Sequence, residues 1–222
     1  MPAPRTPDVN IGSLALAAIG QRYEILGEAE MCIRDSARGV PIGGISAGLA
    51  VQGQFVFTAM EDTVKSPEAL ANPYDSHVTL ARDFLTIPAL KGVITDSHFS
   101  QRERMGRSIA FLARIVQDGW AKEVHGIGID ETTAVLVDAD GHARVVGENS
   151  AYFMTLDHRP EICVDGKPLT VRHVKVWKLS AGAEFDLKSW TGPEGTAMEA
   201  DVVDGKDVYK RQTLGRCEEV RR

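Results

Sequence analysis

The chain of 222 residues is 43% hydrophobic and 25% charged, which is the balance of a globular domain with a sizeable core. Its formal net charge of -6 gives no electrostatic reason to expect nucleic acid or an anionic membrane as a partner. No apolar run is long enough to span a bilayer.

The three cysteines, Cys32, Cys163 and Cys217, lie far apart in the sequence. Their odd number and spacing predict neither a disulfide framework nor a zinc site. The short apolar stretch at residues 11–19 follows Arg5 alone and is a poor match to a signal peptide. We therefore expect a reducing, cytoplasmic location.

The two ends of the chain lack the periodicity of its middle. Residues 1–10 are proline-rich, residues 13–26 are compatible with a helix, and residues 28–36 have no clear period. Residues 31–36 and 207–212 resemble peptides that arise when sequencing-adapter DNA is translated. We therefore interpret 1–36 and 206–222 as atypical, artefactual segments and expect one natural domain at 37–205. The alternative is that both ends are unusual but genuine.

Residues 40–50 predict a buried strand, a tight turn and a helix, and contain the pattern G-x-S-x-G at Gly44, Ser46 and Gly48. Such a nucleophile elbow lifts the serine oxygen clear of the backbone, and small neighbours let the two backbone arms pass closely. The helix start offers N–H groups to a developing oxyanion, with that of Ala47 the first candidate. The alternative is an ordinary strand-to-helix turn.

Downstream, the sequence predicts α/β units and then an antiparallel β tail. Residues 49–57 continue the elbow helix, and residues 90–95 form a second buried strand. Ser100 and Glu103 make a capping-box pattern, so a helix should begin at Ser100 and end at Gly119. Further strands are expected at 126–130, 133–137, 143–146, 152–156, 169–179 and 184–187, with a hairpin turn at 138–141.

Three polar residues follow predicted strands in the order Ser46, His98, Glu131. Ligands bind at the carboxyl ends of strands in open α/β sheets. A serine needs a base to take its proton, and that base needs an acid to fix its tautomer. We therefore predict a Ser–His–Glu triad, with Glu61 as a competing third member because it follows the elbow helix. The alternative makes His98 a hydrogen-bonded cap and Glu131 a solvated turn residue.

Arg102, Arg104 and Arg107 follow His98 closely. Arg104 and Arg107 are three residues apart, so they share one face of a helix. One or two of the arginines would bind a substrate carboxylate, which a guanidinium group holds in a bidentate manner. The alternative is a solvated helix face.

Three motifs together resemble the cyanophycinase-like serine peptidases, which include aspartyl dipeptidase: residues 43–48, 96–107 and 126–134. Each motif alone is weak, but all three in this order are specific, and the resemblance covers residues 37–152 well and the β tail loosely. It implies a three-layer α/β sandwich with a mostly parallel sheet, similar to class I glutamine amidotransferase domains and flavodoxin-like. Members of the family cleave peptide bonds next to aspartate. Cyanophycinase splits cyanophycin, a poly-aspartate chain that carries arginine, into β-Asp-Arg dipeptides.

The resemblance also implies roles for individual residues. Ser46 would be the nucleophile of an acyl-enzyme route and His98 its base, with Glu131 the first choice and Glu61 the second for the acid. Asp96, Arg102 and Arg104 would lie among the substrate-pocket residues. The implied partner is a peptide, either cyanophycin or an aspartyl dipeptide, and no metal or organic cofactor is implied.

The sequence departs from the family ahead of the elbow. Only about 45 residues precede Ser46, and their isolated glycines form no Gly-Gly loop. We therefore expect a sheet that is incomplete at the N-terminus and one missing oxyanion donor, a loss that costs roughly a hundredfold or more in rate. An open sheet edge would favour a homodimer. Two alternatives stay open: a truncated non-catalytic domain of this fold, and an α/β-hydrolase esterase, in which the acid usually precedes the histidine.

Overall fold

The structure, a computed structural model, describes residues 40–85, 87–193 and 197–210, with side chains up to residue 206. Of the atypical segments expected at 1–36 and 206–222, residues 1–36 and 211–222, with Cys32 and Cys217, lie outside the described residues. The described helices are α3 (Ala47–Ala50), α4 (Ser66–Ala71) and α5 (Met105–Gln117), with the short 3-10 helix η1 (Pro88–Leu90). The described strands are β1 (Phe55–Phe57), β2 (Leu80–Arg82), β3 (Val93–Asp96), β4 (Val124–Ile129), β5 (Thr133–Val137), β6 (His142–Gly147), β7 (Ser150–Leu156), β8 (Val171–Ser180), β9 (Glu184–Asp186), β10 (Ala197–Val203) and β11 (Lys206–Lys210).

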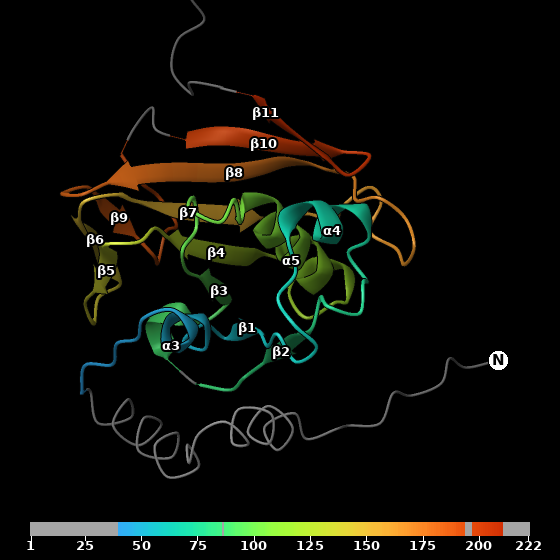
Figure 1. Ribbon diagram of the computed structural model, residues 1–222. Coiled ribbons are helices and arrows are strands. Elements are labelled where there is room, and N and C mark those ends of the chain that lie inside the picture. The colour runs from blue at the N-terminus through green and yellow to red at the C-terminus, as the bar shows by residue number, and fades with distance from the viewer. Residues whose placement is uncertain (1–39, 86, 194–196, 211–222) are drawn as a thin grey trace, which may run out of the picture.

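The main sheet has eight strands in the order β11-β10-β8-β7-β4-β3-β1-β2 (Figure 1). The pairs β1–β3 and β3–β4 are parallel, and from β4 to β11 the neighbours pair antiparallel. This mixed sheet confirms the predicted α/β class with its antiparallel β tail and is consistent with a flavodoxin-like fold. The strands β10 and β11 are additional to the predicted ones, and β11 lies within the segment expected to be an atypical tail.

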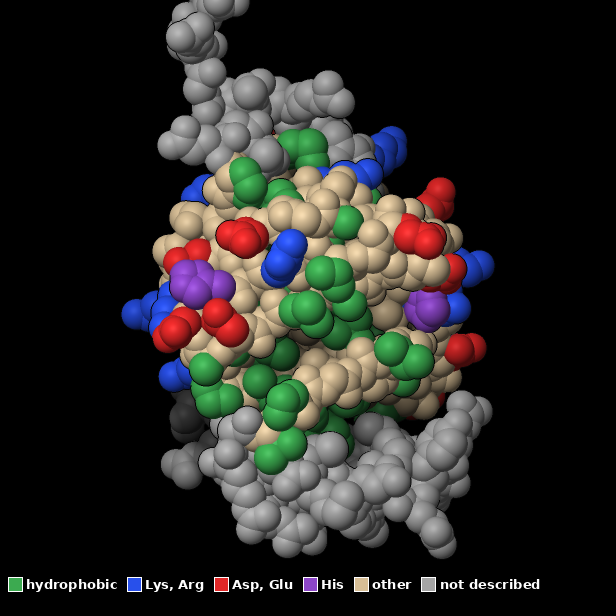
Figure 2. All heavy atoms as spheres, turned by 90° about the vertical axis from the view of Figure 1, so that its left-hand side faces the viewer, with side chains coloured by type: hydrophobic (Ala, Val, Ile, Leu, Met, Phe, Trp, Pro, Cys, Tyr) green, Lys and Arg blue, Asp and Glu red, His purple; other side chains and the backbone are tan. Residues whose placement is uncertain are grey.

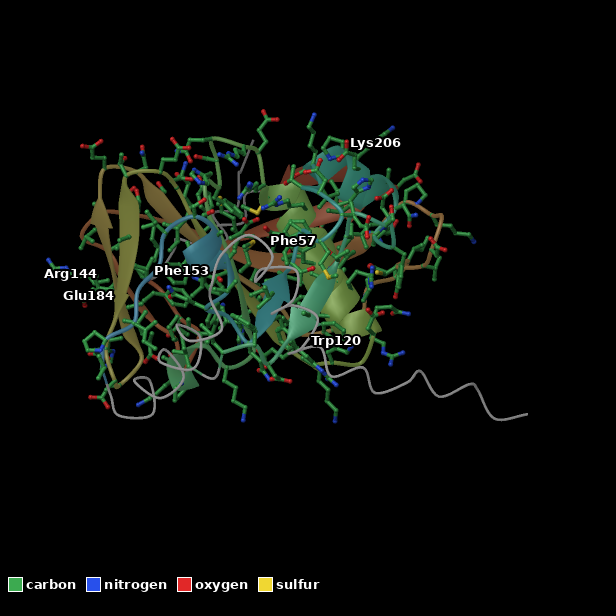
Figure 3. All side chains as sticks on the ribbon, turned by 60° about the horizontal axis from the view of Figure 1, so that its bottom comes forward. Phe57, Trp120, Arg144, Phe153, Glu184 and Lys206 are labelled. Atoms are coloured by element: carbon green, nitrogen blue, oxygen red, sulfur yellow. The ribbon has the colours of Figure 1, made fainter. Side chains whose placement is uncertain are left out.

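Two hydrophobic cores lie on opposite faces of the main sheet. Helices α4 and α5 cover one face, and the three-stranded sheet β5-β6-β9 covers the other together with α3 (Figure 1). Because side chains alternate along a strand, β4 contributes Val124 to the helical core and Ile127 to the second core. Phe153 fills the space between the two sheets, whereas Arg144 and Glu184 point outward from the small sheet (Figure 3).

The helix after the second predicted strand has its expected apolar face and end but starts later than predicted. Ile109, Leu112 and Val116 are buried, and Gly119 ends the helix with a left-handed φ of 73°. The helix begins at Met105 instead of Ser100, because the Ser100 N–H donates to the Asp130 carboxylate and residues 99–104 form turns. The capping box predicted at Ser100 is therefore wrong.

The predicted strand ahead of the elbow is also absent from the structure. Residues 40–45 are irregular, and Ile45 is 88% exposed. A strand needs a partner for its backbone groups, and within the described ranges no segment pairs with 40–45. The elbow helix ends at Ala50 instead of continuing to residue 57, and the chain then turns at Gly53 into β1. A Cβ atom on Gly53 would come within 2.5 Å of the Val93 carbonyl oxygen, so this turn needs a glycine.

The described part of the chain contains no helix that is long and apolar enough to cross a membrane.

Candidate active site

Ser46, His98 and Glu131 lie together at one edge of the main sheet. The His98 Nδ1 atom is 2.8 Å from Glu131 Oε1, and His98 Nε2 is 3.0 Å from Ser46 Oγ. An ionised carboxylate only accepts hydrogen bonds, so the imidazole carries its proton on Nδ1 and donates it to Glu131. The Nε2 atom is then left to accept the Ser46 hydroxyl proton, which is the arrangement that a general base requires.

The backbone is strained at Ser46, at His98 and at the residue that follows Glu131. Ser46 has φ 51° and ψ -117°, His98 has φ 47°, and Thr132, which follows Glu131, has φ 53°. Side-chain-bearing residues rarely adopt a positive φ, and such strain gathers at functional sites. The nucleophile elbow predicted at Ser46 requires a sharp turn of this kind. A Cβ atom on Gly44 would lie 2.3 Å from the Gly48 carbonyl oxygen, so the two arms of this turn do pass closely.

Phe99 anchors the loop that carries His98. Its ring is 1% exposed and packs over β4 at Gly128, and its N–H donates to the Ile129 carbonyl. A Cβ atom on Gly128 would come within 2.3 Å of the Phe99 ring. Gly128 therefore allows the aromatic contact that places the neighbouring His98 at the sheet edge.

We expect Gly128→Ala to lower both the stability and the activity of the site. Overpacking of this kind costs about 1–3 kcal/mol, and movement of Phe99 displaces His98. Urea unfolding and the hydrolysis rate measure the two effects. Gly126→Ala is the matched control, because its Cβ atom would meet the flexible end of Met154 on the same strand face. Equal activity losses in the two variants would show that Phe99 does not position His98.

Two residues that sequence reasoning did not identify hold Glu131 in place. The Glu131 N–H donates to Gln101 Oε1, and Asn149 Nδ2 donates to the Glu131 carbonyl oxygen. Asp130 also stays in the interior, where it accepts hydrogen bonds from the Ser100 and Ser150 N–H groups. These contacts join residues 18 to 30 positions apart, so no local pattern marks them.

Asp96 is the centre of a buried ionic cluster. Arg107 binds it in a bidentate manner, with Nη2 2.6 Å from Oδ1 and Nε 2.8 Å from Oδ2. Arg104 Nη1 donates to the same carboxylate and to the Ser97 carbonyl oxygen. Burial lowers the pKa of Arg104, and the charge of Asp96 opposes that shift. The cluster ties the start of α5 to the end of β3 and so supports the loop that leads to His98.

A cavity of about 240 Å³, here called the arginine cavity, opens beside Ser46. Two guanidinium groups and one carboxylate give its wall a net charge of +1. Within the described part of the chain, both hydrogen bonds of Arg104 leave from Nη1, so its other nitrogens face no internal acceptor. The cavity is lined by Ser46, Phe57, Met60, Asp96, Arg104 and Arg107, among others.

The remaining predicted site residues lie in different surroundings. Ala47 is the first residue of α3 and therefore has no intrahelical acceptor for its N–H, which lies beside Ser46. Arg102 is exposed and lies outside the lining of the arginine cavity. Glu61 is exposed in the loop after β1, and the His98 nitrogen that it would have bound is held by Glu131.

A second depression, here called the hairpin groove, runs from the triad along β5 and has a volume of about 550 Å³. Residues 41–46 line one wall and residues 129–137 the other, with Ser97 and His98 between them. Figure 2 views the molecule from the side of β5, β6 and β9 and shows hydrophobic side chains gathered over the middle of this face. Ser46 thus lies between the arginine cavity and the hairpin groove.

Among the described residues, Cys163 is the free cysteine. Cys163 is buried, and burial raises the pKa of its thiol to about 12, so the thiol stays protonated at neutral pH. Across the described ranges, no group of three or more His, Cys, Asp or Glu side chains is arranged to hold a metal ion.

No family model matches the chain, but several curated proteins do. It is 32% identical to a cyanophycinase of Trichormus variabilis over 162 residues, which are 70% of this chain and 49% of that protein. It is 31% identical to a cyanophycinase of Thermosynechococcus vestitus over 152 residues, 67% of this chain and 42% of that protein. The chain spans about half the length of the curated relatives it matches. These matches agree with the resemblance found in the three motifs, and the chain belongs to a cyanophycinase-like family.

Proposed function

We propose that this chain is a serine-type peptidase that hydrolyses aspartyl peptide bonds through an acyl-enzyme. The observation that carries the proposal is the continuous hydrogen-bonded series from Ser46 through His98 to Glu131, with distances of 3.0 and 2.8 Å. Its similarity to proteins named cyanophycinase supports a peptidase that degrades cyanophycin.

In the proposed reaction His98 Nε2 takes the hydroxyl proton while Ser46 Oγ attacks the peptide carbonyl carbon. Glu131 stabilises the positive charge that forms on the imidazole. The Ala47 N–H donates to the developing oxyanion. His98 then gives its proton to the leaving amine, and a water molecule activated by the same nitrogen hydrolyses the acyl-enzyme.

The charge of the arginine cavity supports an acidic residue next to the scissile bond. The wall beside Ser46 has a net charge of +1, and free nitrogens of Arg104 are suited to a carboxylate. Asp96 is already paired with two arginines, so it does not offer a free carboxylate to a guanidinium group. Substrates of this kind include cyanophycin and aspartyl dipeptides.

The order of the triad supports a peptidase of this family over an α/β-hydrolase esterase. In the esterase the acid usually comes before the histidine, whereas Glu131 follows His98. A chain that hydrolyses simple esters but no aspartyl peptide would contradict this choice.

A fluorophosphonate probe tests the proposed nucleophile. We expect it to label the folded chain at Ser46, with peptide mapping to identify the site. We also expect the same sample to hydrolyse peptides made of several β-Asp-Arg units, such as cyanophycin, to dipeptides. The Ser46→Ala variant is the control and should take up no label. A folded wild-type chain that neither reacts with the probe nor cleaves these peptides would instead be a non-catalytic domain of this fold.

Two finer parts of the proposal concern the state of the protein in the cell. We propose a homodimer, since the short strand β2 is a free edge of the main sheet among the described residues. Light scattering of the purified chain measures its mass directly.

A cytoplasmic location is proposed on the sequence features given above.

A further inference from the structure

We propose that the free edge of β5 binds the extended main chain of the substrate by adding it to the small sheet as another strand. The inference rests on the proposed peptidase function and assigns a binding surface to it. The small sheet has the order β5-β6-β9, so within the described ranges β5 pairs on one side only. A strand edge with unpaired N–H and C=O groups is a surface on which an extended peptide can pair.

The hydrogen-bond pattern shows which groups of β5 face this free edge. The Asp138 N–H donates to His142 O, and the Glu148 N–H donates to Thr132 O. The pairs 138/142 and 132/148 are therefore hydrogen-bonded. Opposite pairs in an antiparallel ladder alternate between hydrogen-bonded and non-hydrogen-bonded, so the pairs 134/146 and 136/144, which lie between these two, are hydrogen-bonded as well. The N–H and C=O groups of the intervening residues therefore point away from β6; these residues are Thr133, Val135 and Val137.

The free edge faces the hairpin groove. All five residues of β5 line this groove. Side chains on a strand alternate between its two faces, so a continuous run of lining residues means that the strand presents its backbone edge. Exposed groups two residues apart along β5 repeat about every 6.8 Å, which is the repeat of an extended peptide.

The edge is continuous with the proposed catalytic groups. Glu131, which holds His98, lies two residues before Thr133, the first residue with free edge groups. A peptide paired with β5 would therefore lie in a groove that Ser46 also lines. Among its described lining residues the groove has two acidic side chains, Asp130 and Glu131, and no lysine or arginine. This charge favours neutral or cationic side chains on the paired peptide, in contrast with the arginine cavity on the other side of Ser46.

Val135→Pro tests the edge, because proline removes one N–H that faces the groove and leaves the bonded pairs with β6 in place. The measurement is the ratio of kcat/KM for an octapeptide, with one aspartate at the scissile bond and otherwise neutral side chains, to that for an aspartyl dipeptide. We expect this ratio to fall about tenfold or more. Glu184→Pro is the matched control. The Glu184 N–H points away from β6, at the opposite edge of the small sheet, and Glu184 does not line the groove. Its substitution by proline should leave the ratio unchanged.

Amide exchange gives a second test that does not depend on a proline variant. In full-length Ser46→Ala protein, the Val135 amide should exchange faster than that of Ala134, and added octapeptide should slow exchange at Val135. Slow exchange at Val135 without peptide would mean that another segment of the chain or a second copy occupies the edge, which would overturn the inference. An unchanged ratio in Val135→Pro, or fast exchange at Val135 with saturating peptide, would also overturn it.

The two proposals fail in different ways. If neither peptide is cleaved and Ser46 takes up no fluorophosphonate, the peptidase function fails and the inference falls with it. If both peptides are cleaved but Val135→Pro leaves the ratio of their kcat/KM values unchanged, only the inference fails.

Discussion

We expect the Glu131→Gln variant to hydrolyse peptides about 10⁴-fold more slowly than the wild type, which is the size of effect found when a triad acid becomes an amide. The Glu131 carboxylate accepts the Nδ1 proton of His98 at 2.8 Å. A glutamine amide can donate to Nδ1 and so favours the tautomer that carries its proton on Nε2. That tautomer cannot take the proton of Ser46, so kcat falls with little change in KM.

Glu61→Gln is the matched control for this experiment, because it removes the same charge from the competing candidate. Glu61 is exposed and does not hold His98, so its substitution should leave kcat within about twofold. A large loss in Glu61→Gln together with a small one in Glu131→Gln would reverse the assignment of the acid. The free energy of unfolding shows whether a loss of activity comes from lost catalysis or from lost folding. The Glu131 side chain is 49% exposed, so Glu131→Gln should lower that free energy by no more than about 1 kcal/mol.

The largest effect on stability is expected at Asp96. Its carboxylate is the counterion of Arg107 and Arg104, whose side chains are 4% and 11% exposed. Asp96→Asn leaves both guanidinium groups in the interior without a negative partner. Removing one partner of a buried ion pair costs about 3–5 kcal/mol, and for a domain of this size we expect a melting temperature roughly 10 °C lower.

Calorimetry of Asp96→Asn distinguishes an internal role from a role in substrate binding. If Asp96 only contacted substrate, the variant would keep its melting temperature and show a higher KM. Glu161→Gln is the control, because Glu161 pairs with Arg172 at the surface and its loss should change the unfolding free energy by less than about 1 kcal/mol. The ion cluster also holds the Ser97 carbonyl oxygen next to His98, so Asp96→Asn should lower kcat as well.

The elements that the sequence predicted well are those with a local signal. The apolar spacing of Ile109, Leu112 and Val116 and the glycine at 119 identified the body and end of α5. The turn at 138–141 between alternating segments identified the β5–β6 hairpin. Each signal comes from side-chain periodicity or turn chemistry within a dozen residues, which acts before any tertiary contact forms.

The sequence also contained the residues that meet at the site, because Ser46, His98 and Glu131 each follow a predicted strand or lie in a recognisable motif. Its local patterns did not decide between Glu131 and Glu61, since both are compatible with a position near His98. The register of β3 against β4 decides this point, because it places the loop that carries His98 beside the loop that carries Glu131.

By itself, then, the sequence determined the α/β class, the hairpin, most of α5 and the chemical types available for catalysis. Only the tertiary structure decided that residues 40–45 form no strand, that α5 begins five residues after Ser100, and that Asp96 is bound internally. It also decided that Gln101 and Asn149 hold Glu131. The physical reason is the same in each case: these outcomes depend on which distant groups satisfy a backbone N–H, a carboxylate or a guanidinium group, and that pairing exists only once the sheet has assembled.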